Sequence, residues 1–321
     1  MLKILLCGST KILDSLNIIK YLSFGAEIND IKKLLKISET LSSEPKDFKE
    51  LLKKELEKHI TYPKAIHNSI KNYLGEEYSS LLTPNNTLGI EYLKSLIKQK
   101  STITPVIIKR ISSSYNDEKI NKISSATAIR KQLIKNNLKQ TKKTLPESTF
   151  KILQSADIVS SIKLFENEIL YQLRTMSEKE ISNLPDTTLE LSKRIKKASD
   201  ISESLEKLIE NIKTKTYTEA RIKRILLYCL LKITKKDIED SKKITPYIRV
   251  LAFNQNGKKI ISEIKKQNPN LNIITHLKKF EQQCKNKKIL RMLQIDKYAT
   301  DIYTLKQPNN PLSNQDYTIK L

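Results

Sequence analysis

The chain has 321 residues, of which 38% are hydrophobic and 29% charged, so it can bury a substantial core and form two soluble globular domains. Its longest apolar run, residues 225–231, is far shorter than the roughly 20 residues that cross a bilayer, and the apolar start of the chain soon meets Lys11 and Asp14, unlike a signal peptide. Three isolated cysteines and three scattered histidines lack the spacing of metal ligands, so we expect a reduced, cytoplasmic protein without a metal site.

The formal net charge of +24 favours an anionic partner such as nucleic acid. Most of the 59 basic residues are lysines, however, and a lysine-rich, tryptophan-free composition also follows from an A/T-biased coding sequence. The few arginines are more informative, because the planar guanidinium matches phosphates and bases better than an ammonium does. Five of them lie in the segments that carry the motifs below: Arg110, Arg130, Arg221, Arg224 and Arg249.

The first part of the chain is predicted to combine amphipathic helices with short strands. Apolar residues at helical spacing predict four helices, over residues 28–41, 48–60, 63–74 and 88–97. The segment Pro84-Asn85-Asn86 breaks the pattern before the fourth helix. Residues 104–109 are apolar and β-branched, which predicts a buried strand that delivers Arg110 and Ile111 to its C-terminal end.

A further helix is predicted to begin at Ser124 and Ser125, which are strong N-cap residues, and to continue through Leu138. The first turn of a helix leaves backbone N–H groups unpaired and carries the positive end of the helix dipole. Together with Thr127 and Arg130, these N–H groups can form a phosphate site. An ordinary capped helix is the alternative interpretation of the same residues.

The segment after this helix is strongly basic. Residues 119–146 include eight basic residues and no acidic ones, among them Lys139, Lys142 and Lys143. Such a charge excess attracts phosphates. Because Leu145-Pro146 is a natural boundary, we divide the chain into domains 1–145 and 146–321.

The second domain is predicted to be mainly helical. Helices are expected over residues 147–154, 161–176, 178–184, 188–198, 201–213, 258–267, 278–284 and 288–303. Short extended segments are expected over residues 246–253 and 272–275, and residues 307–321 are expected to form a polar tail.

The clearest helix of this domain begins with Thr216-Tyr217-Thr218-Glu219, a spacing that predicts a capping box. Apolar residues predict its buried stripe, while Arg221, Arg224 and Tyr228 recur on another face at i, i+3 and i+7. Basic side chains beside a tyrosine suit RNA, whose phosphates attract cations and whose bases stack on rings. A solvated basic surface without a partner is the alternative.

Several of these segments occur together in one known family. Three motifs follow in a set order: PNN-x-LG-x-EY from Pro84, R-I at Arg110, and I-S-S-A-T-x-I-R ending at Arg130. Further matching segments are residues 22–27, 215–222, 246–253 and 299–303. Jointly they resemble the nucleotidyltransferase-like family of bacterial tRNA(Met) cytidine acetate ligases. The resemblance implies an α/β, Rossmann-like ATP-binding domain, N-terminally truncated, followed by a mainly α-helical tRNA-binding domain.

The resemblance also implies an ATP site and a tRNA surface. The expected ATP-binding residues are Gly25, Asn85, Arg110, Ile111, Ser124, Ser125, Thr127 and Arg130. The expected tRNA-binding residues are Lys139, Lys142, Lys143, Arg221, Arg224 and Tyr228. Without the resemblance, Gly25 is equally typical of a tight turn that ends a strand, and Arg110 of a solvated side chain. No catalytic residue is assigned.

The family's reaction activates acetate with ATP to form acetyl-adenylate and pyrophosphate. The exocyclic amine of the wobble cytidine in elongator tRNA(Met) then attacks the activated carbonyl. Positioning and neutralisation of the phosphates would supply most of the catalysis, and Mg²⁺ would accompany ATP. We infer no stable protein partner and no membrane association.

The start of the chain departs from the family pattern. In the family, a Y-N-P-F-H-x-G-H-like motif follows the first strand, and its histidines stabilise the phosphates; this sequence contains no H-x-G-H. The first ten residues could pass for a strand with a phosphate loop, but alignment with the family predicts a helix over residues 8–16 and a strand over 21–24. A sheet without its first strand has an open edge. The alternative function is therefore a catalytically inactive, tRNA-binding member of the family.

Overall fold

The computed structural model describes residues 2–110, 124–135, 137–155, 160–244, 247–307 and 312–318. The chain forms two compact units. Unit 1 comprises Met1–Gln154, Pro246–Ile248 and Phe253–Asn272, and unit 2 comprises Ser155–Thr245, Arg249–Ala252 and Ile273–Leu321. The first unit thus continues past the predicted boundary at Leu145 and takes up a later segment of the chain. No helix among the described residues is long and apolar enough to cross a membrane.

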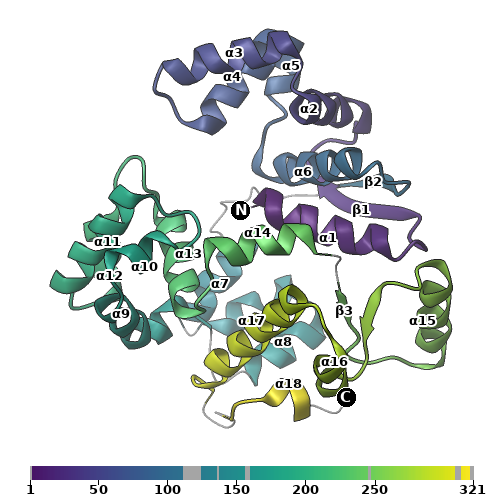
Figure 1. Cartoon of the computed structure of the whole chain (residues 1–321). Coiled ribbons are helices and arrows are strands. Elements are labelled where there is room, and N and C mark those ends of the chain that lie inside the picture. Colours follow the sequence, from purple (N-terminus) through teal and green to yellow (C-terminus); the bar gives the residue numbers. More distant parts are fainter. Residues whose placement is uncertain are drawn as a thin grey trace. The chain divides into compact units, whose positions relative to one another are not determined.

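The centre of unit 1 is a two-stranded parallel sheet. Strands β1 (Tyr21–Ala26) and β2 (Thr104–Lys109) pair in register from Tyr21 opposite Thr104 to Ala26 opposite Lys109. Helix α6 (Pro84–Gln99) packs on β1 and on α1 (Leu2–Ser15), and Figure 1 shows both helices beside the sheet. The N-terminal residues thus form a helix, as the family alignment predicted, and the interpretation as a strand with a phosphate loop is wrong.

The two faces of this sheet differ in burial. Along β1, Phe24 and Ala26 are buried, whereas Tyr21, Ser23 and Gly25 are exposed. Val106 and Ile108 of β2 lie on the same exposed face, with 40% and 61% of their surface exposed. The prediction of a fully buried strand is therefore wrong for β2, because neighbouring side chains of a strand point to opposite faces and only one face is covered by the described residues.

The close approach of α6 to β1 depends on Gly89. A Cβ atom at this position would lie 2.7 Å from Cε2 of Phe24, which is closer than a side chain allows. The ring of Phe24 also stacks on Tyr92, one turn further along α6, with centroids 5.7 Å apart. The core of unit 1 continues from this contact through its buried residues: Leu34, Ile37, Phe48, Leu52, Ala65, Ile70, Ile90 and Leu93.

Most of the remaining helices of unit 1 were predicted. The remaining helices are α2 (Ile31–Ser43), α3 (Lys46–Glu57), α4 (Tyr62–Leu74), α5 (Glu76–Ser79), α7 (Ala126–Ile134), the 3₁₀ helix η1 (Leu138–Thr144), α8 (Glu147–Gln154) and α15 (Gln255–Gln267). Helix α7 begins where Ser125 predicted, but it ends at Ile134 and does not continue through Leu138.

Unit 2 is mainly helical in its described residues. Its helices are η2 (Ile162–Phe165), α9 (Glu166–Thr175), α10 (Glu178–Ser182), α11 (Leu189–Ile201), α12 (Leu205–Ile212), α13 (Glu219–Leu230), α14 (Lys235–Lys243), α16 (Leu277–Gln283), α17 (Lys287–Thr304) and α18 (Gln315–Thr318). Helices α9 to α13 enclose one hydrophobic core. Strands β3 (Tyr247–Arg249) and β4 (Asn272–Ile274) pair as a second sheet. Helices α5, α14 and α18 and the 3₁₀ helix η1 were not predicted.

Candidate functional site

The polar residues at the C-terminal ends of β1 and β2 form one cluster with the start of α6. The backbone N–H of Arg110 donates to the carbonyl of Ala26 at 2.8 Å, so Arg110 directly continues the pairing of the strands. The backbone N–H of Glu27 donates to Oδ1 of Asn86 at 2.7 Å, and Nδ2 of Asn85 donates to Oε1 of Glu27 at 2.8 Å. Ligands of open α/β sheets bind at such strand ends, so this cluster is the candidate site.

The two asparagines have different surroundings. Asn86 is 1% exposed, and its Nδ2 also donates to the carbonyl of Leu81 at 3.1 Å, so both ends of its amide are used inside the protein. Asn85 is 6% exposed and is anchored through Nδ2 alone among the described contacts. Its carbonyl oxygen, unlike that of Asn86, has no hydrogen bond among the described contacts. Sequence reasoning favoured Asn85 and missed the supporting roles of Asn86 and Glu27.

Gly25 and Arg110 lie side by side at the strand ends. A Cβ atom on Gly25 would lie 3.4 Å from Cγ and 3.7 Å from Cδ of Arg110, which are ordinary contact distances. Gly25 is a residue of β1 with no left-handed backbone angle, so the interpretation as a tight turn is wrong. The guanidinium of Arg110 is exposed and has no acidic partner among the described residues. Arg110 is thus available to an anion beside an open stretch of backbone.

The predicted phosphate helix is present as α7. Ser125 is its N-cap, and Oγ of Ser125 accepts a hydrogen bond from the backbone N–H of Ala128 at 3.0 Å. Ser124 precedes the cap, and Thr127 and Arg130 lie in the first two turns, with Arg130 exposed. Helix α7 packs on η1. Ile111 and the residues that lead to α7 lie outside the described residues, so the convergence of α7 with the strand-end cluster stays a prediction.

The lysines after α7 project from η1. Lys139, Lys142 and Lys143 are exposed, whereas Thr141 between them is fully buried. These three ammonium groups have no acidic partner in the part of the chain that the structure describes. They therefore form an uncompensated positive patch, defined here as the η1 patch.

In unit 2, Arg221 and Arg224 converge on Asp186. Arg221 donates from Nε and Nη2 to the carbonyl of Asp186, at 3.1 and 2.6 Å, and Nε of Arg224 donates to its carboxylate at 2.7 Å. The guanidinium of Arg221 also lies 5.3 Å from the ring centroid of Tyr217. Both arginines are thus held in place, and Arg224 also makes a side-chain hydrogen bond with Tyr228.

Tyr228 does not share their exposure. Only 8% of its surface is exposed, and its ring belongs to the core of unit 2. Burial, followed by the nearby carboxylate of Asp186, raises the pKa of its hydroxyl. The expectation that a base stacks on Tyr228 is therefore wrong: Tyr228 shares a face of α13 with Arg221, but the core of unit 2 covers its ring.

The predicted capping box of α13 is also wrong. The N-cap is Thr218, whose side chain makes no capping hydrogen bond. The backbone N–H groups of Thr216 and Tyr217 donate instead to Oγ1 of Thr214, at 3.2 and 3.0 Å. The preceding turn therefore offers an acceptor that the four-residue motif does not reveal.

Comparison with known proteins gives consistent matches along the chain. The family described as HIGH Nucleotidyl Transferase matches residues 7–317. The tRNA(Met) cytidine acetate ligases of Caldanaerobacter subterraneus subsp. tengcongensis and Clostridium perfringens (strain SM101) are 39% and 34% identical over 317 and 327 residues. These alignments cover 97% of this chain and 77% and 78% of the relatives.

Two solved structures match the whole fold. They are crystal structures of Thermotoga maritima TmcAL, one without ligand and one bound with alpha-thio ATP, with TM-scores of 0.89 and 0.85. Each is 26% identical to this chain and covers 98% of it, and the match extends over 79% of the Thermotoga chain.

Proposed function

This chain belongs to the HIGH nucleotidyltransferase family and, within it, to the tRNA(Met) cytidine acetate ligases, and from that membership we propose that it acetylates the wobble cytidine of elongator tRNA(Met). In the first step, a carboxylate oxygen of acetate attacks the α-phosphorus of ATP and pyrophosphate leaves. In the second, the cytidine N4 amine attacks the carbonyl carbon of acetyl-adenylate and AMP leaves. The strand-end cluster of Gly25, Asn85 and Arg110 carries this proposal.

The ATP-binding roles follow from the surroundings of these residues. The open backbone at Gly25 lets the nucleotide approach β1, and the carbonyl oxygen of Asn85 accepts from a base or ribose. The exposed guanidinium of Arg110 neutralises phosphate charge, and Ile111 follows it on the chain. The opening turn of α7 completes the proposed phosphate site through Ser124, Ser125, Thr127 and Arg130.

Magnesium is proposed to arrive with the nucleotide. Among the described residues, no group of three His, Cys, Asp or Glu side chains could hold a metal ion. Magnesium in nucleotide sites is usually bound through one or two carboxylates and the substrate phosphates, and Glu27 supplies one carboxylate to the cluster. The donor set therefore fits a metal that is carried mainly by ATP.

The tRNA is proposed to contact the basic groups of both units. The η1 patch offers three uncompensated ammonium groups, and Arg221 and Arg224 offer guanidinium N–H groups that Asp186 holds in place. Phosphate neutralisation by such groups makes RNA binding weaken as salt rises. A tRNA substrate implies that the protein works in the cytoplasm.

The test is acetate-dependent exchange of labelled pyrophosphate into ATP by the purified chain. We expect exchange, and we expect Arg110→Ala to reduce it about 10²- to 10³-fold, the usual loss for one preorganised donor. Lys109→Ala is the matched control, because Lys109 is the preceding basic residue of β2 and is also exposed. It should retain nearly full exchange.

Two results would oppose the proposal. Equal losses in the two variants would mean that general positive charge matters and that the position of Arg110 does not. No exchange together with intact tRNA binding would support the inactive, tRNA-binding alternative.

A further inference from the structure

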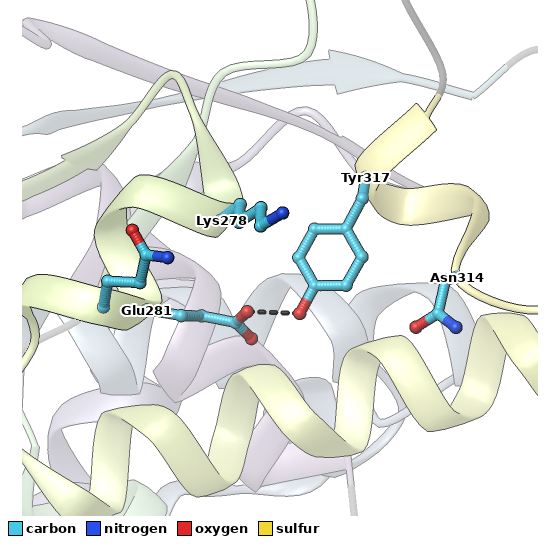
Figure 2. Close-up of a pocket in the computed structure, with 5 residues that line it drawn as sticks. Lys278, Glu281, Asn314 and Tyr317 are labelled. Atoms are coloured by element: carbon cyan, nitrogen blue, oxygen red, sulfur yellow. Dashed lines mark hydrogen bonds between the residues drawn. The ribbon is translucent and has the colours of Figure 1, made fainter.

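Unit 2 contains a pocket that the proposed reaction does not use. It has a volume of about 480 Å³ and is lined by five residues: Lys278, Glu281, Gln282, Asn314 and Tyr317. Figure 2 shows Lys278 and Glu281 on α16 facing Asn314 and Tyr317 of the last described segment. This volume lies within the range of pockets that hold small organic ligands.

The segment that carries Tyr317 forms one wall of the pocket. It is held by residues of the matching segments 246–253 and 299–303, which take no part in the proposed ATP site. Arg249 donates to Asp316 from Nη2 at 3.1 Å and from Nη1 at 3.4 Å, and Oγ1 of Thr300 also donates to Asp316, at 3.3 Å. The carboxylate of Asp301 accepts from the backbone N–H of Asn314 at 2.6 Å. These hydrogen bonds hold α18 against α17, so this wall of the pocket is fixed in place.

The ring of Tyr317 is fixed in one orientation. Its hydroxyl donates to Glu281 and accepts from Lys297, whose ammonium also lies 4.2 Å from the ring centroid. Burial, followed by the hydrogen bond to Glu281, raises the pKa of Tyr317, so the hydroxyl stays protonated at neutral pH. Lys297 lies 3.4 Å from Glu281 and balances its charge. The ammonium of Lys297 thus lies against the ring, which also lines the pocket.

The other lining groups suit a polar, anionic ligand. Gln282 is exposed and carries an amide with both donors and an acceptor, and Asn314 adds a second amide. Lys278 is exposed and has no acidic partner among the described residues. An anionic group of a ligand can therefore pair with Lys278.

We propose that this pocket binds one unpaired nucleotide of the tRNA, with its base on the ring of Tyr317, its base edge at Gln282 and Asn314, and its phosphate at Lys278. The proposal rests on the proposed function, because RNA is the substrate there. Single-stranded RNA is recognised by this combination of an aromatic platform, amides that read base edges and cations that neutralise phosphates. A lone carboxylate ligand would use the cation but leave the ring and amides without partners.

The test measures the Kd of the full chain for tRNA(Met) transcript by fluorescence anisotropy over a range of salt concentrations. Loss of stacking in Tyr317→Leu should weaken binding about 5- to 150-fold, the effect of removing one base–aromatic contact. Gln282→Ala, an exposed change on α16 that leaves the core intact, should weaken binding in the same direction. Lys278→Gln should lower the slope of log K against log salt by about 0.7, one phosphate contact.

The matched control is Lys279→Gln, which removes the neighbouring lysine of α16 without touching the pocket lining. It should leave both the Kd and the salt slope close to those of the unaltered chain. Thermal unfolding of each variant establishes that the fold is retained, and Gln282→Ala decides the question if Tyr317→Leu does not fold.

Three outcomes overturn the inference. In the first, Gln282→Ala and Lys278→Gln bind tRNA as tightly as the unaltered chain does, and the unaltered chain exchanges pyrophosphate. This result refutes the role of the pocket and leaves the proposed function standing. In the second, millimolar CMP or AMP displaces bound tRNA as effectively as excess tRNA does, which would make the pocket a site for free mononucleotides. Failure of the unaltered chain to bind tRNA refutes both this inference and the proposed function.

Discussion

The contact between Gly89 and Phe24 provides a direct test of how α6 meets β1. In Gly89→Ala, the new methyl group would lie 2.7 Å from Cε2 and 3.1 Å from Cδ2 of Phe24, whereas carbon atoms in contact prefer about 3.5–4.0 Å. The ring is confined, since Phe24 is 8% exposed and stacks on Tyr92. Either the ring or the helix must therefore shift.

Two free-energy terms then oppose each other. Alanine is favoured over glycine inside a helix by about 1 kcal/mol. Overpacking a core costs about 1–3 kcal/mol, and an overlap of this size belongs at the upper end of that range. We expect Gly89→Ala to lower the free energy of unfolding by about 1–2 kcal/mol. In a Phe24→Leu background, where the smaller side chain relieves the overlap, the same change should raise it by up to about 1 kcal/mol.

Urea unfolding of the four proteins in this double-mutant cycle measures the coupling. We expect a coupling free energy of about 1–3 kcal/mol. Gly25→Ala is the control, because its Cβ would meet Arg110 at an ordinary 3.4 Å. It should leave stability unchanged or slightly raised while weakening ATP binding at the proposed site. Additivity within about 0.5 kcal/mol, or a stabilised Gly89→Ala protein, would refute the packing argument.

Two further predictions concern unit 2 and the cysteines. Burial alone would raise the pKa of Asp237, but hydrogen bonds from Arg291 and Thr234 outweigh it and lower the pKa. The ionised carboxylate therefore stabilises the folded protein above about pH 4, and this stabilisation is lost as the pH falls through the pKa of the folded state. Asp237→Asn should therefore cost about 1.5–3 kcal/mol at pH 7 and flatten the acid limb of unfolding free energy against pH; an unchanged limb would contradict this. Burial raises the pKa of the Cys229 thiol to about 12, so its thiolate fraction at pH 8 is about 10⁻⁴. Iodoacetamide should therefore label the exposed Cys7 but not Cys229 in the native protein, which peptide mass spectrometry would measure.

Local patterns located the regular elements well. The bounds of β2 and α8 agree with the predicted ranges 104–109 and 147–154, because a run of β-branched residues and a proline before the first turn are local signals. The errors also have local causes. The box from Thr216 to Glu219 does not form, since Oγ1 of Thr214 accepts from the N–H of Thr216 and the N-cap is Thr218.

The candidate site was only partly predictable. Sequence motifs identified Gly25, Asn85 and Arg110, and the structure brings these three to the same strand ends. The sequence did not reveal that Asn86 accepts a hydrogen bond from the backbone of Glu27, because the two residues are far apart along the chain. Such a contact depends on where α6 lies against β1, and neither segment specifies this alone.

The amino-acid sequence by itself determined the family, the order of helices and strands, and the residue types at the strand ends, because motif spacing and periodicity are properties of short segments. Tertiary structure alone decided which of these side chains remain available. Packing turned Tyr228 into the core, paired Arg221 and Arg224 with Asp186, and set Tyr317 opposite α16. The reason is physical: burial and hydrogen bonding between distant segments depend on three-dimensional proximity, which no local pattern encodes.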